Sequence, residues 1–69
     1  MVNLELKEDA PHDWTIITDQ GVELGRRRHQ SVNKAKYWCS VYLSSWSENF
    51  NITVIYDGKS YPFNDDIET

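Results

Sequence analysis

Five cationic side chains lie close together in the middle of an otherwise acidic chain. They fall within residues 25–36, a stretch without any acid, and they are Arg26, Arg27, Arg28, Lys34 and Lys36. One lysine and six acids precede this stretch, and one lysine and five acids follow it, in agreement with the net charge of −4. Arginine binds carboxylate and phosphate through two parallel hydrogen bonds, so this basic block predicts an anion-binding surface.

Three kinds of anion would suit the basic block. The first is internal, because the arginines can pair with neighbouring acids such as Asp13 or Glu23. The second is the acidic surface of a partner protein, and the third is a nucleic acid whose phosphates are contacted from Arg26 to Lys36. Nucleic-acid-binding domains are usually basic as a whole, whereas this chain has a sequence pI of about 4.9. A protein partner is therefore favoured over nucleic acid.

Tyr37 and Val41 predict a second part of the same surface. They stand four residues apart, so they are neighbours on a helix, and both fall on its otherwise polar side together with Lys34. Tyrosine is enriched in the cores of protein interfaces. We expect this helix face to contact a partner protein or a second copy, unless a loop or the acidic tail covers it.

Metal binding and nucleophilic catalysis find little support in the sequence. The candidate ligands His12, His29 and Cys39 form no Cys-x-x-Cys or His-x-x-x-His pair, and the acids form no dense loop. Both histidines are expected to be solvated loop residues. Cys39 falls in the apolar stripe of a predicted helix, where cysteine acts as a small hydrophobe. We therefore expect no enzymatic activity, no catalytic residue, no metal and no other cofactor.

The size and the cysteine content indicate one small domain in a reducing compartment. A chain of 69 residues forms a single domain. Its one cysteine excludes an intramolecular disulfide. The first residues show no basic and apolar regions of a signal peptide, and no apolar run approaches the roughly 18 residues that cross a membrane. We expect a cytoplasmic protein without a membrane partner.

The first half of the chain predicts three strands. Residues 2–7 alternate apolar and polar side chains, which is typical of a half-buried strand. Residues 8–13 contain a proline and three acids and are expected to form a loop. Residues 14–18 are rich in β-forming side chains. After a turn, a third strand begins at Val22 and runs into the arginines.

The turn between the second and third strands decides which side chains share a face. A three-residue turn over 19–21 is a common hairpin form and pairs Thr18 with Val22. It would gather four apolar side chains on one face: Trp14, Ile16, Val22 and Leu24. A two-residue turn would instead place Ile16 opposite Gly25. The first register is preferred because it groups more apolar side chains.

One helix is expected from Ser31 to about Ser47. Ser31 is a favourable N-cap residue, and it places the basic block beside the positive end of the helix dipole. At about 100° per residue, an apolar stripe of seven side chains would face the core. Its members are Val32, Ala35, Trp38, Cys39, Tyr42, Leu43 and Trp46.

The C-terminal part of the chain predicts a β-hairpin. Two stretches rich in β-forming residues flank Asp57-Gly58, which is a preferred type I′ turn pair. This turn sets Val54 opposite Tyr61. Proline cannot donate a hydrogen bond to a neighbouring strand, so Pro62 indicates that the last strand is an edge strand.

These elements follow one another in the order β-β-β-α-β-β. The order predicts a two-layer α+β fold, with a mainly antiparallel sheet of about five short strands and one helix packed on one face. Residues 1–69 would form one small domain, in which residues 64–69 are expected to be a frayed acidic tail.

A small non-enzymatic protein-interaction module is the function that these patterns favour. It would serve as an accessory or inhibitor protein that docks a partner through the basic block and the exposed helix face. The expected partner-binding residues are Arg26, Arg27, Arg28, Lys34, Lys36, Tyr37 and Val41. The alternatives are a nucleic-acid-binding module, a homodimeric structural protein, and an acidic nucleic-acid mimic that uses the acids on either side of the block.

Overall fold

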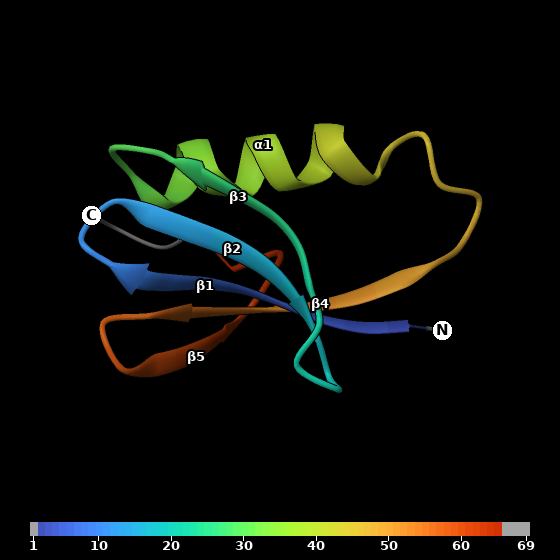
Figure 1. Cartoon of the computed structure of the whole chain (residues 1–69), viewed down its shortest axis with the longest axis horizontal. Helices are drawn as coiled ribbons and strands as arrows, with labels where there is room; N and C mark the ends of the chain where they lie inside the picture. The colour runs from blue at the N-terminus through green and yellow to red at the C-terminus, as the bar shows by residue number, and fades with distance from the viewer. Residues whose placement is uncertain (1, 66–69) are drawn as a thin grey trace.

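A five-stranded sheet and one helix make up the computed structural model, which describes residues 2–65 (Figure 1). In chain order, the elements are β1 (Val2–Ala10), β2 (Asp13–Thr18), β3 (Glu23–Arg28), α1 (Val32–Leu43), β4 (Phe50–Tyr56) and β5 (Lys59–Pro62). The strands lie in the order β3-β2-β1-β4-β5. β1 and β4 pair in parallel, and the other neighbouring strands are antiparallel. The expected α+β fold, with a mainly antiparallel sheet and one helix, is confirmed.

The core lies between the helix and one face of the sheet. The helix contributes four buried side chains, which are Val32, Ala35, Cys39 and Leu43. The sheet contributes Leu4, Leu6, Trp14, Ile16 and Val54. Successive side chains of a strand point to opposite faces, so the other face of the sheet carries mostly polar residues such as Lys7 and Thr53. In the described part of the chain, no element covers this open face (Figure 1).

The expectation of a loop over residues 8–13 is wrong. β1 and β2 extend almost to each other, and only Pro11 and His12 remain between them. His12 adopts a positive φ of 65°, and its N–H donates to the Glu8 carboxylate at 3.1 Å. The acids of this stretch are compatible with strand structure because two of them form ion pairs with an arginine of β3.

Both registers considered for the hairpin of β2 and β3 occur in the structure, one at the turn and the other along the strands. At the turn, the N–H of Thr18 donates to the C=O of Val22 at 2.9 Å, as the three-residue turn requires. A β-bulge then shifts the register, so that Ile16 lies opposite Gly25 instead of Leu24. The expected place of Val22 on the apolar face is also wrong, because this side chain is 55% exposed.

The helix begins where it was expected and ends earlier. The Ser31 hydroxyl accepts a hydrogen bond from the N–H of Lys34 at 3.2 Å, which confirms Ser31 as the N-cap. The helix ends at Leu43 instead of Ser47, and the Ser44 hydroxyl donates to a carbonyl of the last turn at 2.6 Å. Serine side chains compete for backbone hydrogen bonds, so the serine-rich run favours a helix end. Within residues 2–65, no helix has the length and apolar character needed to cross a membrane.

Of the three aromatic residues expected in the apolar stripe, Trp38 packs against the core, whereas the prediction is wrong for Tyr42 and Trp46, which are 37% and 42% exposed. Trp38, Tyr42 and Trp46 follow one another with ring centroids 6.0 and 6.4 Å apart. The Tyr42 hydroxyl donates to the C=O of Leu24 in β3 at 2.7 Å. A Cβ atom at Gly25 would lie 3.4 Å from the Tyr42 ring, which is an ordinary van der Waals contact, so this ring packs directly against β3.

The C-terminal hairpin has the expected register. Val54 lies opposite Tyr61. Asp57 and Gly58 adopt positive φ angles of 53° and 73°, as a type I′ turn requires. β5 is an edge strand, as its proline indicated. Of the predicted acidic tail, residues 66–69 lie outside the described residues.

Candidate functional site

The five cations of the basic block lie in different surroundings. Arg26 and Arg28 occupy alternate positions of β3 and point to the open face of the sheet, whereas Arg27 points to the helix side. Lys34 and Lys36 belong to α1. In the described part of the chain, the two cations that line a common groove are Arg27 and Lys34.

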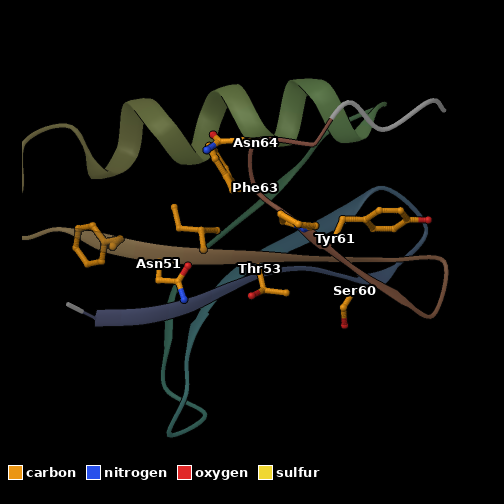
Figure 2. A pocket seen from close by; sticks show the side chains of 9 residues that line it. Asn51, Thr53, Ser60, Tyr61, Phe63 and Asn64 are labelled. Atoms are coloured by element: carbon orange, nitrogen blue, oxygen red, sulfur yellow. The ribbon is translucent and has the colours of Figure 1, made fainter.

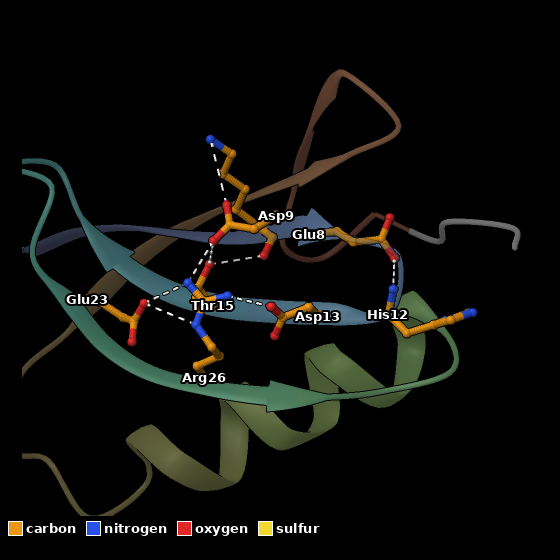
Figure 3. Close-up of polar contacts among 8 residues, drawn as sticks. Glu8, Asp9, His12, Asp13, Thr15, Glu23 and Arg26 are labelled. Carbon is orange, nitrogen blue, oxygen red and sulfur yellow. Dashed lines mark hydrogen bonds and ion pairs between the residues drawn. The ribbon is translucent and has the colours of Figure 1, made fainter.

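Arg26 is the centre of an ion-pair cluster on the open face (Figure 3). Its guanidinium donates hydrogen bonds to the carboxylates of Glu23 at 2.9 Å, Asp13 at 2.5 Å and Asp9 at 3.1 Å. The hydrogen bonds to Glu23 and Asp13 raise the pKa of Arg26. Internal pairing, the first kind of anion considered for the block, therefore applies to Arg26.

Lys36 connects the helix to the segment after β5. Its Nζ donates to the C=O of Asp65 at 2.6 Å. The same Nζ lies 5.5 Å from the centroid of the Phe63 ring, within the range of a cation–π contact. Lys36 thus contacts its own chain and does not share a groove with Arg27.

A groove between β3 and α1 brings together four of the seven predicted binding residues. This β3–α1 groove has a volume of about 570 Å³ and is lined by Arg27, His29, Asn33, Lys34, Tyr37, Trp38 and Val41. Tyr37 is 74% exposed and Val41 is 53% exposed. Within residues 2–65, no loop covers these two side chains.

The β3–α1 groove combines an apolar wall with two positive charges. Tyr37 and Val41 lie one turn apart on α1, and Trp38 lines the groove beside them. No ion pair between described residues involves Arg27 or Lys34. An anionic group that entered the groove would therefore meet two cations without displacing an internal carboxylate.

His29, which directly follows the three arginines, also lines the groove. Its ring packs against Trp38 with centroids 5.1 Å apart, so it is not the solvated loop residue that was expected. Its Nε2 is buried and has no hydrogen-bond partner among the described residues. Burial lowers the pKa of His29, and the positive charges of Arg27 and Lys34 lower it further. The groove therefore contains a neutral imidazole with a free polar atom.

The lowered pKa of His29 leads to a testable pH dependence of stability. The folded pKa lies below the ordinary value of 6.5, so the unfolded chain takes up this proton first as the pH falls. The free energy of unfolding should therefore fall as the pH is lowered through 6.5 and then through the folded pKa of His29. His29→Phe keeps a ring against Trp38 and removes the titration, so its melting temperature should fall less between about pH 7 and about pH 5.

The control for this experiment replaces the other histidine. His12→Asn changes an exposed turn residue, and asparagine tolerates the positive φ found there. This variant should lose as much melting temperature on acidification as the wild type. An equal loss in the wild type and in His29→Phe would contradict the assigned environment of His29.

A second hollow lies beside β4 and β5 (Figure 2). Its volume is about 510 Å³. Asn51, Thr53 and Ser60 point to one side of the strand pair, whereas Phe63 and Asn64 lie toward the helix. None of the described residues that line it is acidic or basic. This hollow therefore offers less to a charged partner than the β3–α1 groove does.

The one cysteine lies in the core and does not line the β3–α1 groove. Cys39 is fully buried, and burial raises the pKa of its thiol to about 12. Thiolate is the reactive form of cysteine, so this side chain is unreactive near neutral pH. Within residues 2–65, no three His, Cys, Asp or Glu side chains form a group that could hold a metal ion.

Comparison with family models, with curated proteins and with solved structures gives no match to this chain. The geometry of the β3–α1 groove is therefore the basis for assigning a function.

Proposed function

We propose that this chain is a small non-enzymatic protein-interaction module that binds an acidic segment of a partner protein in the β3–α1 groove. The observation that carries this proposal is the presence of two exposed apolar side chains, Tyr37 and Val41, in one groove with Arg27 and Lys34. Tyrosine and arginine dominate the residues that contribute most to protein binding. The module would work in the cytoplasm as an accessory or inhibitor protein, in keeping with its single free cysteine.

The composition of the groove favours a partner that is both acidic and apolar. A purely apolar segment would remove water from Arg27 and Lys34 without supplying a counter-charge, which is unfavourable. A long polyanion would leave Tyr37 and Val41 uncovered, and the net charge of −4 would repel it. A peptide with carboxylates next to an apolar side chain satisfies both parts of the groove.

Selection from a random peptide library displayed on phage tests this proposal. The wild-type chain should enrich peptides in which acidic residues stand next to apolar ones. In a binding assay with an enriched peptide, Lys34→Glu should weaken the affinity about tenfold, because it replaces an attraction by a repulsion. Lys59→Glu is the matched control, since it makes the same charge change at an exposed position at the start of β5. This control should change the affinity by less than about twofold, because salt screens a distant surface charge.

Four outcomes would contradict the proposal. Enriched peptides without acidic residues would exclude an acidic partner, and an equal loss in the two lysine variants would exclude the groove. Stronger binding to DNA or RNA than to any peptide, with a steep dependence on salt, would favour the competing nucleic-acid function. A stable dimer in light scattering whose formation depends on Tyr37 and Val41 would favour a homodimeric structural protein.

A further inference from the structure

One wall of the β3–α1 groove comes from the end of an edge strand. β3 is the last strand on this side of the sheet (Figure 1), and Arg27 of this strand and His29, which follows it, line the groove. The helix forms the other wall. The hydrogen bond from Tyr42 to Leu24 shows that a helix side chain reaches the backbone of this strand edge. A segment lying in the groove would therefore lie beside an unpaired strand.

The hydrogen bonds at the end of the hairpin show which backbone groups of β3 face outward. The N–H of His29 donates to the C=O of His12 at 2.9 Å, so this residue faces β2. Inward and outward residues alternate along an antiparallel strand. Arg27 and Gly25 therefore also face β2, while the N–H and C=O groups of Arg26 and Arg28 point away from the sheet. The outward C=O of Leu24 agrees with this alternation, because Tyr42 binds it from outside.

The outward groups form a short, bounded edge. Tyr42 occupies the edge at Leu24, which leaves two N–H and two C=O groups, those of Arg26 and Arg28. The side chain of Arg27, between them, points to the helix side and lines the groove. A strand that paired with these groups would direct alternate side chains toward Arg27, Lys34 and Tyr37.

The charges beside this edge favour an acidic strand over a second copy of the chain. If β3 of one copy paired with β3 of a second copy along Arg26–Arg28, arginines would lie opposite arginines. Like charges directly opposite each other on neighbouring strands are destabilising. Carboxylates on an added strand would instead lie near Arg27 and Lys34 on the helix side, whereas the open face beside Arg26 already carries the carboxylates of Asp9, Asp13 and Glu23. The edge therefore suits an extended acidic segment of another protein.

We infer that the partner segment binds as an additional β-strand along Arg26–Arg28, with alternate side chains in the β3–α1 groove. This inference rests on the proposed function and specifies its binding mode. Main-chain hydrogen bonds of this kind supply affinity, and the side chains that enter the groove supply specificity.

A pair of variants at one position isolates the backbone contribution. Arg28→Pro removes an outward N–H and leaves the β2–β3 hydrogen bonds intact, because proline is tolerated where the N–H faces solvent. Arg28→Ala removes the same side chain and keeps the N–H. The probe is a synthetic peptide of alternating Glu-Glu and Val-Val pairs, so that each face of the extended chain carries both acids and valines. Arg28→Pro should bind it about tenfold more weakly than Arg28→Ala, because one hydrogen bond is lost.

Amide hydrogen exchange of the wild type gives a second measurement that needs no variant. Saturating peptide should slow exchange at the N–H groups of Arg26 and Arg28 about tenfold, because each gains a hydrogen bond. The N–H of Arg27 already faces β2, so its exchange should change less.

The outcomes separate this inference from the proposed function. Unchanged exchange at Arg26 and Arg28, while the peptide shifts the NMR signals of Lys34 and Tyr37, would overturn the added strand and leave the proposed function intact. Equal affinities of the folded Arg28→Pro and Arg28→Ala variants would also overturn the added strand and leave the proposed function intact. No binding of the peptide even at millimolar concentration would overturn the inference, and failure of the library selection as well would overturn the proposed function.

Discussion

Replacing Trp14 by alanine is expected to remove a large part of the free energy of unfolding of this protein. The Trp14 side chain is 0% exposed and stacks on Tyr56 with ring centroids 5.8 Å apart. Removing a buried tryptophan costs about 3–5 kcal/mol. At about 0.05–0.15 kcal/mol per residue, a chain of 69 residues has a total stability of roughly 3–10 kcal/mol. The loss is therefore comparable with the whole stability, and circular dichroism during urea unfolding measures it.

Trp46→Ala is the matched control for this substitution. Trp46 is 42% exposed. Its ring lies between those of Tyr42 and Phe50, with centroids 6.4 and 5.6 Å away. Its removal should cost clearly less than that of Trp14, because the partly exposed Trp46 side chain buries less apolar surface. Equal losses in the two variants would contradict the assignment of Trp14 to the centre of the core.

Tyr37→Ala should have the largest effect on binding and almost none on the fold. Tyr37 is the most exposed large apolar side chain of the described residues and lines the β3–α1 groove. Truncating an aromatic residue at the centre of an interface costs about 2 kcal/mol or more, which is roughly a 30-fold loss of affinity. The melting temperature should not fall, since alanine has the higher helix propensity. Calorimetric titration with a selected acidic peptide and thermal unfolding measure the two effects.

A pair of valines provides a matched test of the same surface. Val41 and Val22 are 53% and 55% exposed, and Val41 lies in the groove whereas Val22 lies in the turn before β3. Val41→Ser should lower the affinity for the peptide about fivefold, because the apolar contact of Val41 is lost. Val22→Ser should leave the affinity unchanged. The groove would be the wrong surface if both valine variants bound equally well or if Tyr37→Ala retained full affinity.

Elements whose signals are local could be predicted from the sequence. Ser31 begins the helix because its own hydroxyl accepts the bond from Lys34. Asp57 and Gly58 form the turn because both residues adopt positive φ angles with little strain. The alternation along β1 shows that one of its faces is buried, but it does not show that β4 would pair with this strand in parallel.

The register of β2 and β3 depends on contacts between distant residues. The two registers differ by one residue, and the bulge that combines them places Gly25 under the rings of Trp38 and Tyr42. The sequence of β2 and β3 alone does not indicate where the helix packs on them. The same limit applies to His29, whose contact with Trp38 exists only because the chain returns across the end of β3.

The distribution of the arginines follows from strand geometry once the strands are known. Alternation along β3 separates Arg27 from Arg26. The sequence indicates a loop over residues 8–13 and so does not predict the pairing of Arg26 in full, because Asp9 and Asp13 belong to β1 and β2. A basic block that looks continuous in the sequence thus consists of one internally paired arginine, one lysine bound to its own chain, one arginine on the open face, and two groove cations.

A map of NMR amide shifts tests the central claim, that the β3–α1 groove is the binding surface, most directly. The ¹⁵N-labelled wild-type chain would be titrated with the acidic peptide that the library selection enriches most. The largest shifts are expected at the end of β3 and along the exposed side of α1, at Arg27, His29, Lys34, Tyr37 and Val41. Largest shifts on the open face around Lys7, or in the hollow between β4 and β5, would contradict it.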